Sequence, residues 1–256
     1  MTNSTLLYYW IAIPLLFAPF CPFQATEMAY PAAPAFVKII FHNNVKGDSL
    51  VLGDAAYVNP FGEKYTISKL RYYVSNVALL NGNHSYEEQN SYHLIDASKS
   101  ESKVISLSVP AGEYQQLQFL LGVDSLHNVS GAQTDDLDPA KDMFWTWNSG
   151  YVMAKMEGQS PASNRVNHSF EFHIGGFSGP FNVLKEIHLN FPGNSGHLVA
   201  GKSYEIVIDA DVNQWWEGSN AIRLSQNPVI TTPGANAKKI SDNYAHMFRI
   251  LKVMTD

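Results

Sequence analysis

Apolar and polar residues alternate along much of the chain with a period of two, and this pattern constrains the fold more than any other feature of the sequence. Such alternation is typical of strands that bury one face. In the first stretch Val37, Ile39 and Phe41 share one side of the expected strand, and Lys38 and His42 alternate with them. Further stretches of the same kind cover residues 104–109, 117–123, 170–174, 183–191 and 204–208.

Helical periodicity is scarce, because only residues 213–217 and 237–245 are candidates for short helices. Strands that are separated by Gly, Pro, Asn and Asp turns, without helices between them, are typical of antiparallel all-β folds. The sequence therefore predicts an all-β chain, folded as an antiparallel β-sandwich with long loops and one or two short helices. The side chains that we expect in its core are Leu117, Phe119, Phe170, Phe172, Ile206 and Ile208.

The N-terminal segment is nearly free of charge, and its apolar stretch over residues 6–20 is too short and too rich in proline to span a bilayer comfortably. Small residues follow it, so we expect a signal peptide over residues 1–25, a linker over 26–35 and one domain over 36–256. The expected location is secreted, periplasmic or on the outer surface of the cell. Cys21, the single cysteine, lies inside the expected signal, and a lipid on Cys21 is the alternative to cleavage.

Composition and motifs exclude several classes of protein. The formal net charge is −6, and no run of basic residues is longer than Lys238–Lys239, which argues against nucleic-acid binding. The motifs of zincin proteases, P-loop enzymes and dinucleotide-binding proteins are absent. The stretch Gly176–Pro180 resembles a nucleophile elbow only superficially, since no helix is expected after it. Any chemistry must therefore depend on the nine histidines, the acids and the aromatic residues.

Two histidines are candidates for metal ligands. His173 belongs to an expected strand whose phenylalanines face the core, so its imidazole points to the opposite face, and Gly175–Gly176 then permit a sharp bend. His42 stands at the end of the first expected strand and also faces away from the apolar side. Neutral imidazoles suit copper or zinc, and two of them can hold a cuprous ion with few other ligands. The alternative is that both are surface histidines, as we expect for the other histidines.

The segment Met143–Tyr151 is the densest aromatic element of the chain. If it is extended, Met143, Trp145 and Trp147 lie on one face. A strip of this kind is more typical of a core or of a sugar-stacking surface than of a redox site.

Two aspartates stand in loop-like sequences, Asp124 after Gly122–Val123 and Asp138 before Pro139. Their carboxylate oxygens suit a hard cation such as calcium. The spacing of an EF-hand is absent, so calcium is a secondary expectation beside copper.

Taken together, several of these segments resemble those of a known family. They are Tyr65–Asn76, Gly122–Ser125, Leu137–Pro139, Met143–Tyr151, Phe172–Gly175 and Asp242–Phe248. In this order they are similar to the MbnP-like family, whose relatives are the methanobactin-partner and MopE/CorA-type copper-binding proteins. The most specific part is Trp-x-Trp-Asn-x-Gly-Tyr followed by His-x-Gly, and the resemblance covers the whole expected mature chain.

The resemblance implies an extracytoplasmic β-sandwich that binds copper, in some members through two histidines and a tryptophan that is oxidised to kynurenine. Carried over to this chain, it implies His173 and His42 as copper ligands and Trp145 or Trp147 as the oxidised tryptophan. The implied partners are a di-haem enzyme, similar to cytochrome c peroxidases, that performs the oxidation, and an outer-membrane copper-uptake system.

We therefore expect an extracytoplasmic copper-binding protein with no catalytic turnover of its own. A second hypothesis is a cell-surface glycan-binding or adhesion module, because the chain has 5 tryptophans and 13 tyrosines, and exposed aromatic strips would favour it. A third is a metal-dependent hydrolase, which needs three protein ligands, an open position and a nearby base such as Glu171.

Overall fold

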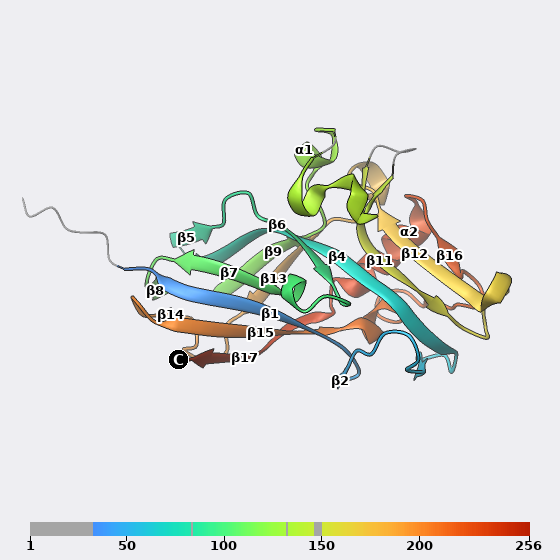
Figure 1. Cartoon of the computed structure of the whole chain (residues 1–256), viewed down its shortest axis with the longest axis horizontal. Coiled ribbons are helices and arrows are strands. Elements are labelled where there is room, and N and C mark those ends of the chain that lie inside the picture. The colour runs from blue at the N-terminus through green and yellow to red at the C-terminus, as the bar shows by residue number, and fades with distance from the viewer. Residues whose placement is uncertain (1–32, 83, 132, 146–149) are drawn as a thin grey trace, which may run out of the picture. The chain divides into compact units, whose positions relative to one another are not determined.

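The chain folds into β-sheets, and the computed structural model describes residues 33–82, 84–131, 133–145 and 150–256. Within these ranges there are three sheets, of five, ten and two strands (Figure 1). The expected signal peptide, Cys21 and most of the expected linker lie outside the described residues. Residues 32–256 form one compact unit.

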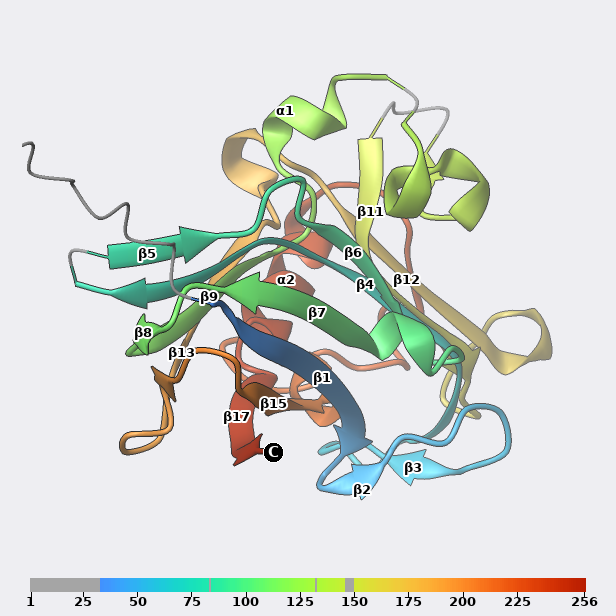
Figure 2. The same ribbon diagram turned by 60° about the vertical axis from the view of Figure 1, so that its left-hand side comes forward.

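The first sheet is built around β1, which lies between one antiparallel and one parallel neighbour. β7 pairs with it antiparallel, as Figure 2 shows, and β15 pairs with it parallel from Phe36 with Ser203 to Asn44 with Asp211. The strands of this sheet are β1 (Ala35–Val45), β2 (Asp48–Ser49), β7 (Val104–Val109), β15 (Ser203–Asp211) and β17 (Phe248–Thr255).

The second sheet is organised by β4, an 18-residue strand that pairs with five other strands along its length. Its register with β9 shifts between Ser75 and Ala78, where Asn76 has a φ of 52°. A bulge of this kind bends a strand and increases its twist. The ten strands are β3 (Tyr57–Val58), β4 (Lys64–Asn81), β5 (His84–Glu87), β6 (Tyr92–Asp96), β9 (Gln116–Leu121), β10 (Phe144–Trp145), β11 (Gly150–Gln159), β12 (Ser169–Gly175), β13 (Lys185–Asn190) and β16 (Val229–Ile230).

Aromatic side chains join the two large sheets in one core. The ring of Phe41 on β1 lies 6.2 Å from the ring of Tyr72 on β4 and 5.9 Å from that of Phe119 on β9. Edge-to-face contacts of this kind add to the stabilisation that burial provides. Every residue predicted for the core is fully buried, at 0% exposure for Leu117, Phe119, Phe170, Phe172, Ile206 and Ile208.

Short elements complete the structure. Strands β8 (Gly112–Glu113) and β14 (His197–Leu198) form the two-stranded sheet, and the α-helices are α1 (Ser125–Asn128) and α2 (Ala235–Tyr244). No helix in the described part of the chain is long and apolar enough to cross a membrane. The 3-10 turns are η1 (Glu101–Lys103), η2 (Asp135–Leu137), η3 (Pro139–Lys141), η4 (Val166–His168), η5 (Gly179–Phe181) and η6 (Val212–Trp215).

The prediction of an all-β chain with one or two short helices is confirmed. The strand pairs β1–β15 and β12–β16 differ from the antiparallel expectation, because both are parallel and the sheets are therefore mixed. Alternation along one strand fixes which face is buried but not the direction of its neighbour. His42 also differs from its expected place, since β1 continues beyond it to Val45.

Substitution of Gly158 on β11 tests how closely the strands of the second sheet are packed. A Cβ at this position would lie 1.9 Å from the carbonyl oxygen of Thr66 and 2.8 Å from Cε1 of Phe170. We expect Gly158→Ala to lower the free energy of unfolding by about 3 kcal/mol, measured by denaturant titration, because the neighbouring strand must move. The control is Gly112→Ala, whose added Cβ would have its nearest neighbour at 3.9 Å. Equal stability of the two variants would contradict this packing.

Candidate functional site

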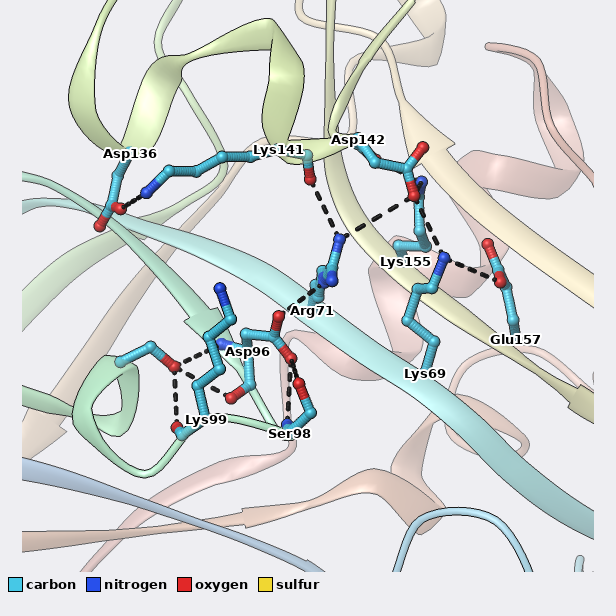
Figure 3. A network of polar contacts seen from close by, with 11 residues as sticks. Lys69, Arg71, Asp96, Ser98, Lys99, Asp136, Lys141, Asp142, Lys155 and Glu157 are labelled. Atoms are coloured by element: carbon cyan, nitrogen blue, oxygen red, sulfur yellow. Dashed lines mark hydrogen bonds and ion pairs between the residues drawn. The ribbon is translucent and has the colours of Figure 1, made fainter.

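A row of charged side chains crosses the ten-stranded sheet on the face that points away from the core. Asp96 of β6, Arg71 of β4, Lys155 of β11 and His173 of β12 are register partners in this order. Register partners share one face of a sheet, and the residues beside them along the strands face the core. We call these four residues the charged row, and Figure 3 shows the part from Asp96 to Lys155.

Lys155 is the most enclosed member of the charged row, with a side chain that is 3% exposed. Its Nζ donates to the backbone carbonyl of Asp142 and lies 3.0 Å from Oδ2 of the same residue (Figure 3). Lys69 donates to this carboxylate at 3.1 Å. Partial burial alone would raise the pKa of Asp142, but the hydrogen bonds from Lys155 and Lys69 lower it below its usual value. The buried ammonium thus ties the loop that contains Asp142 to the sheet.

His173 ends the charged row and is oriented by a carboxylate. Its Nε2 lies 2.8 Å from Oε1 of Glu157, and Lys69 lies 3.2 Å from Oε2 of the same residue. The bond with His173 lowers the pKa of Glu157 to about 2, together with Lys69 and against the effect of burial. Because an ionised carboxylate only accepts, Nε2 is the protonated nitrogen in this contact, and Nδ1 is the nitrogen that Glu157 does not engage.

The other end of the charged row borders a polar cavity of about 550 Å³. Arg71 donates from Nε to Oδ2 of Asp96 at 2.8 Å and from Nη1 to the carbonyl of Lys141 at 3.0 Å. Burial alone would raise the pKa of Asp96, but hydrogen bonds from Ser98 and the charge of Arg71 lower it. The cavity lining includes Arg71, Asp96, Lys99 and Lys141, so it presents charges of both signs to a ligand.

Trp145 lies on the same side of β12 as His173. A Cβ added to Gly175 would be 2.5 Å from Cζ3 of this indole, so the ring packs directly against the glycine. His173 and Gly175 are two positions apart on one strand, which puts them on the same face and about 7 Å from each other. Trp145 is 7% exposed and contributes, with Tyr151, to the lining of a cavity of about 300 Å³.

His42 lies in the other sheet and has its own partners. Its Nε2 is 2.9 Å from Oγ of Ser49, and its Nδ1 is 3.5 Å from Oδ1 of the buried Asp209. Arg249 contacts the other oxygen of Asp209 at 2.6 Å. Both predicted histidines point away from the core that the two sheets share. The structure therefore does not bring His42 and His173 together.

The two aspartates that were candidates for a hard-cation site have different local partners. Asp138 accepts from the backbone N–H of Ala140 at 2.8 Å and caps η3. Asp124 caps α1 and contacts Tyr92 and His127. No group of three or more His, Cys, Asp or Glu side chains is arranged to hold a metal ion within the described ranges.

The aromatic strip of Met143–Tyr151 is only partly described, and Trp147 lies outside the described residues. Where the segment is described, Met143 is 0% exposed and Trp145 is buried. Trp215 and Trp216 are also fully buried, at 0% exposure. These described tryptophans are thus buried, and none of them forms an exposed sugar-stacking strip of the kind that would favour glycan binding.

Sequence reasoning missed Lys155 and Glu157, although a signal for them exists. Both are charged residues inside the largely apolar strand β11. Charged residues are almost never fully buried without a partner, so a lysine in such a strand predicts an ion pair. Its partner Asp142 belongs to a loop, and no spacing rule identifies it.

The fold and this site define an all-β protein of mixed sheets with a histidine and an indole on one outer strand face. The family model MbnP matches residues 34–233, so the chain belongs to the MbnP family. This confirms the resemblance seen in the sequence, and the family is associated with copper systems. The solved structure of MbnP from Methylosinus trichosporium is similar at 15% identity, with 78% of this chain and 82% of that chain covered and a TM-score of 0.49. No curated protein matches the chain.

The ion pair of Lys155 with Asp142 can be tested by a double-mutant cycle. We expect Asp142→Asn to lower the free energy of unfolding by about 2 kcal/mol, because it leaves the Lys155 ammonium enclosed without its carboxylate. Asparagine tolerates the left-handed backbone of Asp142, whose φ is 60°. In the Lys155→Met background the same substitution should cost much less. Additive costs in denaturant titrations would contradict this coupling.

The ion pair of Glu157 predicts a dependence of stability on pH. Its pKa is about 2 in the folded chain and its usual value is 4.5, so the ionised form stabilises the fold above about pH 4.5. This contribution is lost as the pH falls from 4.5 towards 2. Glu157→Gln should therefore cost about 2 kcal/mol near pH 6, and the difference from the wild type should vanish near pH 2.

The matched control is Glu186→Gln, because the side chain of Glu186 is 70% exposed. This substitution should leave unchanged the loss of folding stability between pH 4.5 and pH 2. A cost of Glu157→Gln that is the same at every pH would show that ionisation of this residue does not stabilise the fold.

Proposed function

We propose that the chain is an extracytoplasmic copper-binding protein whose copper site includes His173. Two findings support this: membership of the MbnP family, and the place of His173 on the outer face of β12. The observation that carries the proposal is the contact of the Trp145 indole with Gly175, two positions from His173. It combines, on one strand face, the two residue types through which some members of this family bind copper.

The local chemistry of His173 suits a metal ligand. Glu157 accepts a hydrogen bond from Nε2, which fixes the tautomer and leaves Nδ1 as the donor for copper. Imidazole is a borderline ligand that suits both oxidation states of copper. The described residues supply one imidazole at this place, so further ligands belong to the proposal. They are a modified Trp145 or Trp147, and His42, which lies in the other sheet, is not one of them.

The proposed modification would change what an indole can offer to copper. Oxidation of tryptophan to kynurenine opens the indole ring and frees an aryl amine, whose nitrogen has a lone pair for a metal. In this proposal a di-haem partner enzyme performs the oxidation and an outer-membrane uptake system receives the copper. The chain itself binds the ion and does not catalyse turnover.

The decisive experiment measures Cu(I) affinity by competition with a chromogenic chelator. We expect His173→Ala to weaken binding at least tenfold while circular dichroism stays unchanged, because this side chain lies outside the core. The control is His188→Ala, whose imidazole lies on the exposed side of β13 beside Gln116. Unchanged copper stoichiometry and affinity in His173→Ala would refute the proposed site.

His42→Ala, measured in the same assay, decides whether the first strand contributes a ligand. Because His42 and His173 lie in different sheets, we expect this variant to bind copper like the wild type. The intact mass of the protein from its native host would report whether one tryptophan has been converted to kynurenine. A mass equal to that calculated for the unmodified chain would remove this part of the proposal.

A further inference from the structure

A cluster of three side chains lies apart from the charged row, at the start of β6 and at α1. The hydroxyl oxygen of Tyr92 lies 2.6 Å from Nδ1 of His127 and donates to Oδ2 of Asp124. Nδ1 of His127 is 3.1 Å from both carboxylate oxygens of Asp124. One nitrogen and three oxygens, each a known type of metal ligand, thus lie within hydrogen-bonding distance of one another.

Two of the four separations within this cluster match those of ligands around one ion. Zinc binds histidine nitrogen and carboxylate oxygen at about 2.0–2.2 Å, so adjacent ligand atoms around it lie roughly 3–3.5 Å apart. The two separations of 3.1 Å between His127 and Asp124 lie in this range. The two contacts of the Tyr92 hydroxyl are shorter, because protons rather than an ion join the atoms there.

The surrounding structure holds the three residues in place. Ser75 of β4 is the register partner of Tyr92, and its hydroxyl donates to the carbonyl of Gly122 at 2.8 Å. This contact puts the start of β6 beside the chain segment that leads to Asp124. On the other side, Oδ1 of the buried Asn128 accepts from the backbone N–H of Tyr151 at 2.9 Å, which anchors α1 to β11.

The cluster is accessible from a cavity of about 490 Å³, whose lining includes Tyr92 and His127. This lining carries two glutamates, Glu87 and Glu88, and among its described residues there is no lysine or arginine. A cavity with this balance of charge attracts cations and raises their local concentration. Asn90 and Gln118 add amide groups to the same lining.

We propose that Tyr92, Asp124 and His127 form a metal site for a borderline divalent ion, Zn(II) or Cu(II), distinct from the proposed site at His173. A mixed set of imidazole and oxygen ligands suits these ions, whereas calcium takes six to eight oxygen ligands. On binding, the O–H bond of Tyr92 breaks, its proton leaves to solvent and the oxygen binds the ion. His127 binds through Nδ1 in its neutral form, and Asp124 binds as the carboxylate. The net change is the uptake of one dication and the release of one proton.

The test is titration of the chain with Zn(II) in the His173→Ala background, so that its outcome does not depend on the proposed copper site. Zinc is free of redox chemistry, and a coordinated tyrosinate changes the ultraviolet absorption of Tyr92. We expect binding of one zinc ion by calorimetry, together with a tyrosinate difference spectrum and the release of about one proton. Binding without the tyrosinate spectrum, or no binding, would overturn the proposal.

Substitution of each proposed zinc ligand in turn tests whether that side chain binds the ion. In the same background, His127→Ala should weaken zinc binding at least tenfold, and Tyr92→Phe should remove the difference spectrum. Asp124→Asn keeps an oxygen to cap α1 and should also weaken binding. The control is His197→Ala, whose histidine lies at the surface beside Glu113. Zinc affinity that is the same in His127→Ala as in the control would refute the site, provided that circular dichroism shows both variants folded.

Discussion

The ammonium group of Lys155 is the constraint on which the arrangement of the charged row depends. A lysine with a side chain that is 3% exposed must have a partner, and the loop before β10 supplies both a carboxylate and a carbonyl from Asp142. Three residues further along that loop, Trp145 enters β10 and packs against Gly175. The ion pair of Lys155 with Asp142 thus holds the loop from which Trp145 reaches Gly175, two positions from His173.

Strand β4 links this region to the Tyr92 cluster. Its first half contributes Lys69 and Arg71 to the outer face around Lys155, and its second half contributes Ser75, which joins β6 to the segment after β9. The register shift between Ser75 and Ala78 separates the two halves. One bulged strand therefore supports two polar clusters that border different cavities.

Much of the fold was predictable because alternation reports burial directly. The residues predicted for the core, such as Phe119 and Phe172, are fully buried, and α2 was expected within two residues of its start. The site was less predictable, since alternation gives the face of a strand but not the sheet to which it belongs. His42 and His173 both face outwards as expected, yet they lie in different sheets. Contacts such as Lys155 with Asp142 depend on loop paths, about which local spacing says nothing.

The parallel pairing of β1 with β15 has a consequence for how the chain reaches its structure. The first strand of the described fold needs a neighbour that begins at Ser203, so the five-stranded sheet cannot close until most of the chain is available. Contacts of such high sequence separation carry a large loop-closure entropy and are associated with slow folding. The pairing of β1 with β7 needs only the first half of the chain, whereas the other edge of β1 stays open until the segment that begins at Ser203 arrives.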